Sequence, residues 1–511
     1  MRNWPRAALL SLSDKGGAEE FARRLARGGT RLLASGGTAR HLEQAGLKVT
    51  PVEQWPGMGE LLGGRVKTLH PHIHAPILAR RDVPADLTAL EELSLEPIDL
   101  VAVTLYPFEQ RAATLDEAAA LEEIDIGGVA LLRAAAKNHR DVVVIHDPSQ
   151  YAEVLEALES DRVTAERRRE WAARAFARTA RYDAAIASEL ERRGSGGEPP
   201  ALHLIGLERV RTLRYGENPH QGAALYGRSG ARATLAARRE GKELSYNNWL
   251  DLMAAGSLAW RFDAPSCVIV KHGEPCGAAS ARSLAEACRL ALESDALSAF
   301  GGIAAINRPL DPESAALLAR PFLECVAAPE FPPEALRHFE SKKNLRVLSL
   351  GRDDVTSSDH WSVRILGQWA LLQSEPAGET APWRAVTHIT PNESQVVALR
   401  FAWEIAAAAR SNAAALASGT ALIGLGSGQT SRVDAVDVAV MKARRSGHPL
   451  EGTVLASDGF FPFPDGVEHA ARAGVAALVQ PGGSVRDPEV IAACDRLGVS
   501  MMFTDRRMFR H

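Results

Sequence analysis

One local pattern recurs through the first third of the chain: a short apolar run, a turn rich in glycine or serine, and then a helical spacing of apolar residues. The apolar runs lie at residues 7–12, 31–34, 98–105 and 142–146. Runs of this length, bounded by turn residues, are typical of strands that are buried on both faces. Strand–turn–helix repetition predicts a parallel sheet covered by helices, and therefore an α/β fold.

The composition changes near residue 194, which predicts the main domain boundary. A long helix rich in arginine and alanine ends there in the run RRGSGGEPP at 192–200, whose composition is typical of a linker. We therefore expect one domain at 1–195 and a second region at 196–511. The second region is long enough for two similar α/β lobes.

Charge and cysteine content restrict the class of protein. There are 59 basic and 63 acidic side chains, with a formal net charge of −4, so no basic field favours nucleic acid or a membrane surface. Five cysteines without a C-x-x-C pair predict neither a disulfide framework nor a thiolate zinc site. We found no signal-peptide pattern and no long apolar stretch, so we expect a cytoplasmic protein with neither membrane nor nucleic acid as a partner.

Two turns in the first 40 residues are suited to binding a phosphate. The segments 13–17 (SDKGG) and 35–38 (SGGT) each leave a strand and enter a helix. Unpaired N–H groups and the helix dipole favour an anion there. Each turn can also be an ordinary helix cap, because caps use the same residues. Two such turns, one with a lysine, favour a phosphorylated ligand.

The run GGRVKTLHPHIH follows these turns and carries two cations and three histidines. In an extended chain Arg65 and Lys67 project to the same side, where they can grip a phosphate or polarise a carbonyl. His70, His72 and His74 alternate in the same way, a spacing that can bind zinc. No carboxylate or cysteine lies nearby in the sequence, so we expect ordinary polar histidines and no metal.

Asp125, Lys137 and Tyr106 are the remaining polar candidates of the first region. Asp125 precedes two glycines and a helix predicted over 129–137, which Lys137 closes. The alanines before Lys137 leave the end of that helix bare, with room for a ligand. Tyr106 follows a predicted strand, and α/β sheets bind ligands beyond the C-terminal ends of their strands.

In the second region the run CVIVKHGEPCG at 267–277 is the most informative. Lys271 and His272 end an apolar strand, where a histidine can act as a general base. HGEPC partly matches the signature of zinc deaminases, H-x-E and P-C-x-x-C. Position 279 is alanine, however, so zinc would have too few ligands and we reject deamination.

Other runs in this region remain ambiguous. GLGSGQ at 424–429 lacks the last glycine of a dinucleotide-binding loop and predicts only close backbone approach. The rings of FFPFP at 460–464 can stack on a flat heterocycle or fill a core. RYGENPHQ at 214–221 and LSYNNW at 244–249 can be phosphate-binding or simply polar loops. An alanine-rich helix is predicted over 400–417.

In this order, the motifs SDKGG, ASGGTAR, GRVKTLHP, LYPFE, IDIGG and RAAAKNH resemble the inosine monophosphate (IMP) cyclohydrolase domain of the bifunctional purine-biosynthesis family. RYGENPHQ, ELSYNN, VIVKH, SAFGG, SNA, GSGQ, FFPFPDGV and QPGG resemble its aminoimidazole carboxamide ribonucleotide (AICAR) formyltransferase half. The resemblance implies an N-terminal domain like methylglyoxal synthase and two cytidine-deaminase-like lobes without zinc, divided near residue 365. It also implies a homodimer with formyltransferase sites at the interface.

The resemblance implies two reactions. A formyl group moves from the co-substrate 10-formyltetrahydrofolate to AICAR, and formyl-AICAR then closes to IMP with loss of water. No catalytic metal is implied, and a structural monovalent cation is left open. Two alternatives remain: a formyltransferase with a degenerate first domain, and a nucleotide-binding regulator without catalysis. The intact lysines of both predicted sites and His272 argue against the regulator.

Site residues follow from the same resemblance. The implied catalytic residues are Lys67, Tyr106, Asp125, Lys137, Lys271 and His272. The implied nucleotide- or folate-binding residues are Ser13, Lys15, Ser35, Gly36, Gly37, Thr38, Arg65, Thr68, Arg214, Tyr215, Asn248, Gly301, Glu324, Asn412, Arg432, Phe460, Asp465, Pro481 and Arg507. Gly16, Thr104 and Glu274 depart from the family pattern, which commonly has Thr, Asn and Asn there.

Overall fold

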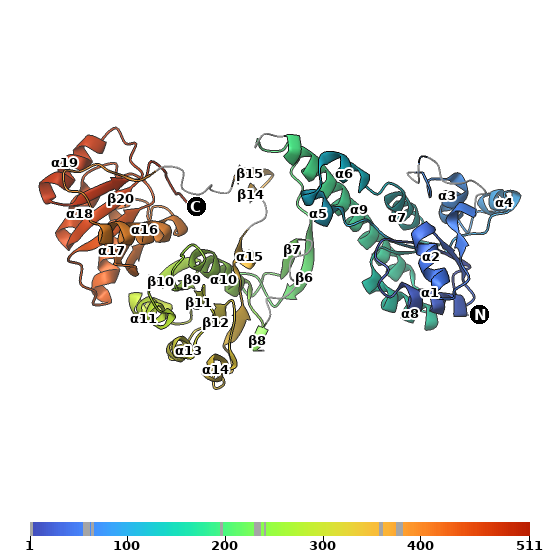
Figure 1. The fold of residues 1–511 in the computed structure, drawn as a ribbon, viewed down its shortest axis with the longest axis horizontal. Coiled ribbons are helices and arrows are strands. Elements are labelled where there is room, and N and C mark those ends of the chain that lie inside the picture. Colours follow the sequence, from blue (N-terminus) through green and yellow to red (C-terminus); the bar gives the residue numbers. More distant parts are fainter. Residues whose placement is uncertain are drawn as a thin grey trace. The chain divides into compact units, whose positions relative to one another are not determined.

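The chain forms two compact units, Met1–Gly206 and Leu207–His511 (Figure 1). The computed structural model describes residues 4–54, 62, 66–194, 198–228, 237–239, 242–356, 361–374 and 382–511. The boundary expected between 195 and 196 falls in a segment outside these residues, shortly before the division between the units. In the described part of the chain, no helix is both long and apolar enough to cross a membrane.

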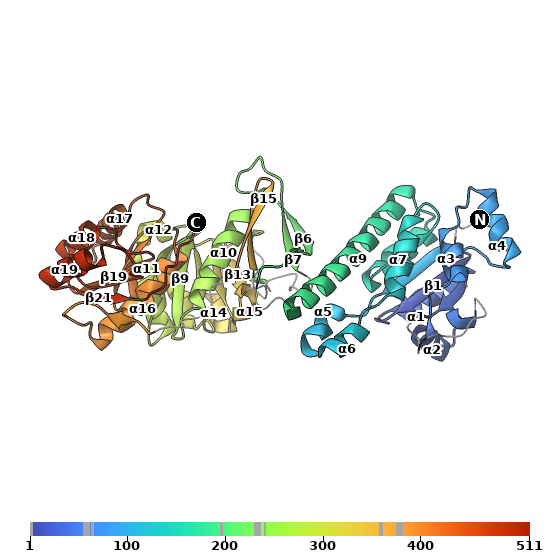
Figure 2. The same cartoon turned by 90° about the horizontal axis from the view of Figure 1, so that it is seen from above.

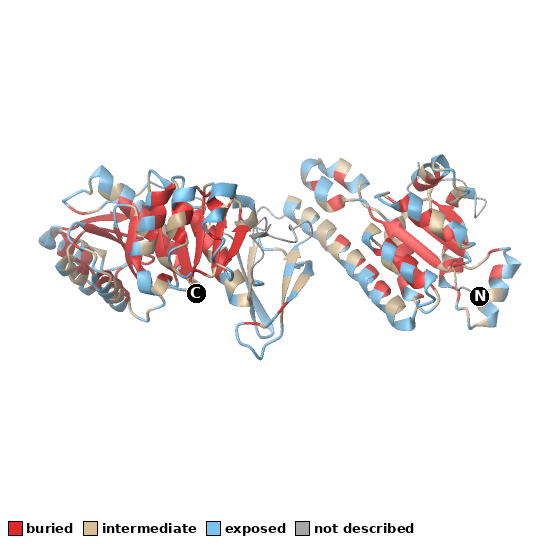
Figure 3. Ribbon diagram, turned by 90° about the horizontal axis from the view of Figure 1, so that it is seen from below, coloured by how far each residue is buried: buried red, intermediate tan, exposed pale blue. Residues whose placement is uncertain are grey.

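A five-stranded parallel sheet forms the centre of the N-terminal unit, in the order β3-β2-β1-β4-β5. Its strands are β1 (Ala7–Leu12), β2 (Arg31–Ala34), β3 (Thr50–Pro51), β4 (Leu100–Thr104) and β5 (Val143–Ile145). Most residues of these strands are buried, which is why they occur as apolar runs without alternation (Figure 3). The predicted parallel α/β sheet is confirmed.

The helices of this unit are α1 (Ala18–Arg27), α2 (Gly36–Gln44), α3 (Pro71–Leu78), α4 (Pro84–Glu92), α5 (Phe108–Arg111), α6 (Glu117–Glu122), α7 (Gly127–Lys137), α8 (Tyr151–Glu159) and α9 (Ala165–Gly194). Of these, α1, α2, α7 and α9 contact strands of the sheet. Helices α7 and α9 lie side by side, and α7 packs on β4 and β5 (Figure 2). Trp171 and Tyr182 of α9 are fully buried in this core.

The C-terminal unit contains one twelve-stranded sheet built from two sets of six strands with the same topology. The sets are β10-β9-β11-β12-β13-β8 and β18-β17-β19-β20-β21-β16. In each set a hairpin leads into three parallel strands, and an antiparallel strand closes the edge. The sets join where Ala279 of β10 faces Ala421 of β18. This repetition agrees with two similar lobes, and their likeness to cytidine deaminase stays a prediction.

The elements of this unit have the following bounds. The sheet comprises β8 (Ala237–Arg239), β9 (Ser266–Lys271), β10 (Glu274–Ser280), β11 (Ile303–Ile306), β12 (Cys325–Ala328), β13 (Arg346–Ser349), β16 (Arg384–Ala385), β17 (Ala414–Ser418), β18 (Ala421–Gly426), β19 (Thr453–Ser457), β20 (Val475–Gln480) and β21 (Ser500–Phe503). The helices are α10 (Tyr246–Ala259), α11 (Leu284–Ser294), α12 (Ala296–Ala299), α13 (Pro312–Leu318), α14 (Pro333–Arg337), α15 (Arg352–Val355), α16 (Glu393–Ala408), α17 (Arg432–Arg445), α18 (Asp465–Ala473) and α19 (Asp487–Leu497). Two further hairpins are β6 (Leu207–Leu213) with β7 (Ala223–Arg228), and β14 (Trp361–Leu366) with β15 (Trp369–Ser374).

The helix predicted over 400–417 is wrong in its second half. Helix α16 ends at Ala408, and residues 414–418 form strand β17 in the middle of the sheet. Alanine has the highest helix propensity, which favoured one long helix. Pairing with β18 and β19 overrides that propensity, because small side chains also fit a strand buried between neighbours.

Candidate active sites in the two units

The C-terminal ends of β1 and β4 meet at one edge of the N-terminal sheet. The backbone N–H of Ser13 donates to the Thr104 carbonyl at 3.2 Å, and that of Asp14 donates to the Thr104 hydroxyl at 2.9 Å. Thr104 therefore joins the first predicted phosphate turn to β4. Lys15 follows in the same turn, and Gly17 has a positive φ of 71° before α1 begins.

The second predicted turn enters α2 at the same edge. The Thr38 hydroxyl is buried, and it accepts from the Leu12 N–H at 2.8 Å, so it joins α2 to β1. The Ser35 hydroxyl lies 3.0 Å from that of Ser11. Gly36 and Gly37 form the first turn of α2, where N–H groups face outward from the helix start.

Glu53 is a site residue that the sequence did not reveal. It lies in a short 3₁₀ helix (Val52–Gln54), and its Oε1 accepts from the Gly36 N–H at 3.2 Å. The ammonium of Lys67 lies 3.3 Å from the same oxygen. A carboxylate of the chain itself thus lies at the start of α2, beside the predicted phosphate turn. No local pattern marks Glu53, because the contact depends on how the chain returns from β3.

Asp125 lies before the start of α7, next to Tyr106 and Thr68. Its Oδ1 accepts from the Gly128 N–H at 2.7 Å, and its own N–H donates to the Tyr182 hydroxyl at 2.8 Å. Burial raises the pKa of the Asp125 carboxyl, and hydrogen bonds from the Gly128 and Tyr106 backbones oppose that shift. A Cβ on Gly127 would lie 2.4 Å from the Thr68 hydroxyl, so the Thr68 side chain packs directly against the start of α7.

Lys137 lies at the other end of α7, about 15 Å from Gly127 along the helix axis at 1.5 Å per residue. Two cavities follow this helix. One, of about 420 Å³, is lined by Asp125, Arg133 and Tyr182. The other, of about 460 Å³, is lined by Lys137 and again by Arg133. The single chain therefore does not bring Lys137 to Asp125, although both adjoin cavities that share Arg133.

The extended conformation assumed for the histidine run is wrong. Helix α3 begins at Pro71, and His70 caps it by accepting from the His72 N–H at 3.1 Å. Residues two apart do not share a helix face, so the period-two alignment of the three histidines is lost. Among the described residues no group of three or more potential ligands could hold a metal ion. Arg65 lies outside the described residues.

In the C-terminal unit Lys271 and His272 lie at the tip of the β9–β10 hairpin. Lys271 pairs with Glu274, so the turn contains only His272 and Gly273. The Lys271 ammonium donates to the Phe300 carbonyl at 2.6 Å, next to Gly301.

Glu324 lies where β12 begins, beside the start of β11. Its N–H donates to the Gly302 carbonyl at 3.0 Å, and its carboxylate pairs with the guanidinium of Arg346. Since Ile303 of β11 lies opposite Val270 of β9, these strand starts share an edge with the hairpin tip. The structure therefore groups Lys271, Gly301 and Glu324.

Arg432 and Asn412 lie together in the second lobe. The buried Arg432 guanidinium donates to Asp458 Oδ1 at 2.6 Å and to Asn412 Oδ1 at 2.7 Å. Asp458 is fully buried and also accepts from the Ala413 N–H at 3.1 Å. Sequence reasoning assigned Asp458 no role, because the groups that it binds, Arg432 and the Ala413 N–H, are distant in sequence.

The remaining predicted site residues of this unit do not form a single cluster with these two groups. Phe460 is partly exposed, whereas its neighbour Phe461 is in the core. Arg507 lies over the Phe509 ring at 4.4 Å. Pro481 is buried after β20, and Asp465 begins α18.

Two predicted residues have their polar groups engaged locally. The Asn248 side chain forms part of the capping box of α10, where its Oδ1 accepts from the Ser245 N–H at 3.1 Å. Arg214 donates to the hydroxyl of Tyr215 at 3.0 Å and lies over its ring.

A hydrogen bond links the two lobes beside the hairpin tip. The Arg410 N–H donates to Glu274 Oε2 at 3.3 Å, and the Gly428 N–H donates to the Arg410 carbonyl at 2.7 Å. The hairpin of the first lobe therefore lies next to the loops before β17 and after β18. The group around Lys271 and the group around Arg432 therefore lie at the same edge of the sheet.

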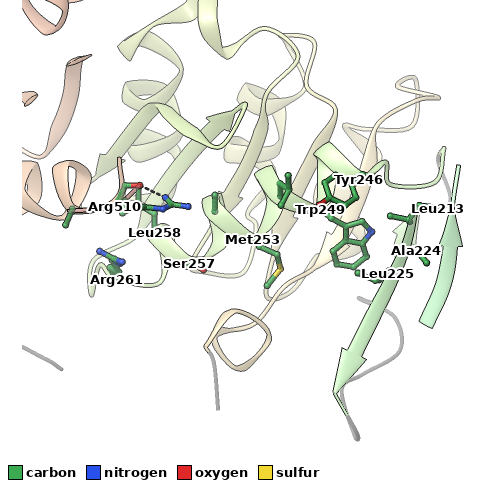
Figure 4. A pocket seen from close by; sticks show the side chains of 14 residues that line it. Leu213, Ala224, Leu225, Tyr246, Trp249, Met253, Ser257, Leu258, Arg261 and Arg510 are labelled. Atoms are coloured by element: carbon green, nitrogen blue, oxygen red, sulfur yellow. Dashed lines mark hydrogen bonds between the residues drawn. The ribbon is translucent and has the colours of Figure 1, made fainter. Parts of the chain in front are cut away.

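A cavity of about 530 Å³ runs along α10 (Figure 4). Tyr246 and Trp249 line it near the β6–β7 hairpin, and Arg261 and Arg510 line its other end. The motif LSYNNW therefore contributes two aromatic side chains to a mainly apolar hollow.

Comparison with known proteins identifies the family. A model described as AICARFT/IMPCHase bienzyme matches residues 135–442, and a model of the MGS-like domain matches 17–130. A bifunctional purine biosynthesis protein PurH from Chloroflexus aurantiacus is 48% identical over 99% of this chain and 98% of its own length. The protein of the same name from Rhodopirellula baltica is 46% identical over 99% of both. A crystal structure titled ForH is 38% identical over 36% of this chain and 98% of that one, with a TM-score of 0.33. With a family model over more than half its length and full-length relatives, the chain belongs to the AICARFT/IMPCHase bienzyme family.

Proposed function

We propose that the two units of this bifunctional purine-biosynthesis enzyme each carry one of its activities. The N-terminal unit closes formyl-AICAR to IMP, and the C-terminal unit transfers a formyl group from 10-formyltetrahydrofolate to AICAR. One observation carries the proposal: each unit has a lysine and a proton acceptor at an edge of its own sheet. In the N-terminal unit Lys67 lies beside the start of α2, and the next residue, Thr68, lies against the start of α7, where Asp125 is bound. In the C-terminal unit Lys271 is followed by His272 at the hairpin tip. The family resemblance adds a homodimer with formyltransferase sites at the interface.

In ring closure, Asp125 acts as the general base. The carboxamide nitrogen is a poor nucleophile, and it loses a proton to Asp125 as it bonds to the formyl carbon. The raised pKa of Asp125 makes its carboxylate a stronger base than an exposed one. Lys67 stabilises the negative charge that develops on the formyl oxygen, which then leaves as water with that proton and a second one from nitrogen.

The turns at 13–17 and 35–38, at the same edge of the N-terminal sheet, bind the phosphate of the nucleotide. The N–H groups at the start of α2 lie beside the Lys67 ammonium, and Lys15 lies in the turn that follows β1. Lys137 has no step in this mechanism, because one chain holds it at the far end of α7. Its implied catalytic role stays a prediction from resemblance.

In formyl transfer, His272 takes the proton from the exocyclic amine of AICAR as the amine nitrogen bonds to the formyl carbon. The bond between the formyl carbon and the folate nitrogen breaks, and that nitrogen takes up a proton. Lys271 stabilises charge on the formyl oxygen during transfer. Asn412 and Glu324 lie along the same sheet edge and contact nucleotide or folate.

Two lysine variants test the division of labour. Lys271→Met should prevent formation of formyl-AICAR from AICAR and 10-formyltetrahydrofolate, yet still convert supplied formyl-AICAR to IMP. Lys67→Met should accumulate formyl-AICAR without IMP. Lys48→Met, at an exposed site between α2 and β3, is the matched control and should retain both activities. Loss of both activities in a folded Lys271→Met protein would show that the division is wrong.

A further inference from the structure

A buried carboxylate lies directly under the turn that carries His272. Asp251, on α10, is only 8% exposed. Its Oδ2 accepts from the His272 N–H at 3.1 Å, and its Oδ1 accepts from the Gly273 N–H at 2.6 Å. One side chain therefore holds both backbone donors of the two-residue turn, 21 and 22 positions away in sequence.

The turn needs such support because of its backbone conformation. His272 has φ 56° and Gly273 has φ 78°. Positive φ at both central residues is the pattern of a type I′ hairpin turn, which follows the right-handed twist of the strands. Glycine adopts this conformation freely, whereas a histidine adopts it at a cost and stays there when its surroundings hold it.

Helix α10 is a rigid base for the carboxylate. Leu252 and Ala255, which follow Asp251 along the helix, are fully buried and pack in the same core as Val268 and Val270 of β9. The hairpin that carries His272 is thus packed on the helix that carries Asp251. A shift of the Asp251 carboxylate must therefore shift the turn.

We propose that Asp251 is a positioning residue for His272 in formyl transfer. It does not reach the reacting atoms itself; it fixes the turn so that the imidazole meets the amine of AICAR. The inference rests on the proposed role of His272. A displacement of a catalytic group by about 1 Å can lower a rate by about a hundredfold, so the anchor has a measurable effect.

Asp251→Asn is the first test. The amide has one oxygen acceptor, so its NH₂ group must face the second turn N–H, and the turn moves. We expect kcat for formyl transfer to fall about tenfold to a hundredfold, with KM for AICAR changed less than about twofold. Ring closure of supplied formyl-AICAR should be unchanged, and an unchanged calorimetric transition of the C-terminal unit verifies that this unit is folded.

Asp311→Asn is the matched control. Asp311 also uses both carboxylate oxygens in the same lobe, accepting from the N–H and the hydroxyl of Ser314 at 2.8 and 2.9 Å. It caps α13, after the far end of β11, and should leave kcat for formyl transfer unchanged. If Asp251→Asn does not fold, Asp251→Glu replaces it, because it keeps the charge but displaces the oxygens by one methylene. The same loss of kcat is expected.

A double-mutant cycle separates positioning from other roles. In a His272→Ala background, Asp251→Asn should cause no further loss of formyl transfer, since no imidazole remains to be positioned. An equal fold-loss in both backgrounds would overturn the inference. Loss of activity in His272→Ala with full activity in Asp251→Asn would also overturn it while leaving the proposed function intact. Full formyl transfer in His272→Ala would overturn the role of His272 and the inference together.

Discussion

At the scale of single residues, Asp125 serves catalysis at the expense of stability. Burial raises its pKa above the ordinary value of 3.8, so the folded state binds the proton more tightly than the unfolded state. The free energy of unfolding contributed by this group therefore falls as pH rises through 3.8 to the raised pKa. A general base must be ionised, and in that form of Asp125 the fold bears the cost of its burial.

Asp125→Asn should separate these two effects. The amide cannot ionise, so at pH 7 the N-terminal unit should be at least as stable as in the parent, and the difference should disappear towards pH 4. Ring closure should fall about a hundredfold or more, because the general base is lost. Thermal unfolding from pH 4 to 8 and conversion of formyl-AICAR are the measurements. A lower melting temperature at pH 7 would show that the hydrogen bond from Gly128 outweighs the cost of burial.

His146 should make the same unit sensitive to acid. Burial lowers its pKa from 6.5 to about 4, so the folded state binds this proton more weakly than the unfolded state. Its contribution to stability is present above pH 6.5 and is lost as pH falls from 6.5 towards 4. His146→Asn should reduce the loss of melting temperature in this range. His41→Asn, at a partly exposed histidine of α2, is the control, and an equal reduction there would contradict the assignment to His146.

At the scale of elements, the starts of helices carry the site of the N-terminal unit. Helix α2 begins beside the Lys67–Glu53 pair, and α7 begins beside Asp125 and Thr68. Both helices open with glycines, and the space around each glycine decides what it does. A Cβ on Gly128 would lie 2.4 Å from Asp125 Oδ2, whereas one on Gly194, at the end of α9, would meet nothing within 4 Å.

Gly128→Ala should therefore impair catalysis despite the higher helix propensity of alanine. The Asp125 carboxylate must move away from the new methyl group, and ring closure should fall about tenfold or more. Formyl transfer by the other unit is the internal reference. Gly194→Ala should leave ring closure at the parental rate, so an equal loss in the two variants would contradict the steric explanation.

At the scale of the whole molecule, each unit has its own hydrophobic core. A large cluster and a small one around Leu90 lie in the N-terminal unit, and the clusters of the C-terminal unit lie around its twelve-stranded sheet. Stability can therefore be changed in one unit alone. The buried Arg432–Asp458 ion pair is suited to destabilising the C-terminal unit selectively, because removal of one partner leaves an uncompensated charge in the interior.

Asp458→Ala should destabilise the C-terminal unit by about 3–5 kcal/mol, the usual effect of breaking a buried ion pair. In calorimetry the transition of that unit should move to lower temperature, while ring closure by the N-terminal unit keeps its thermal stability. Asp437→Ala removes a solvent-exposed partner of His469 and should shift neither transition by more than about 1 kcal/mol. A matching loss of heat stability in ring closure would show that the units unfold together.

Local sequence by itself determined much of this protein. The strands at 7–12 and 31–34 form where they were predicted, because a short apolar run between turn residues has few alternatives. The motifs that resemble the family were sufficient to identify it. The turns at Ser13 and Ser35 and the tip at Lys271 were also found, because each follows a strand directly.

Tertiary structure alone decided the rest. Glu53, Asp251 and Asp458 carry no local signal strong enough to find them, because each acts on groups that are distant in sequence. The strand at 414–418 follows from burial and pairing rather than from residue preference. A pattern of residues specifies elements over a few turns or strands, but a buried carboxylate is stable only where the folded chain brings donors to it.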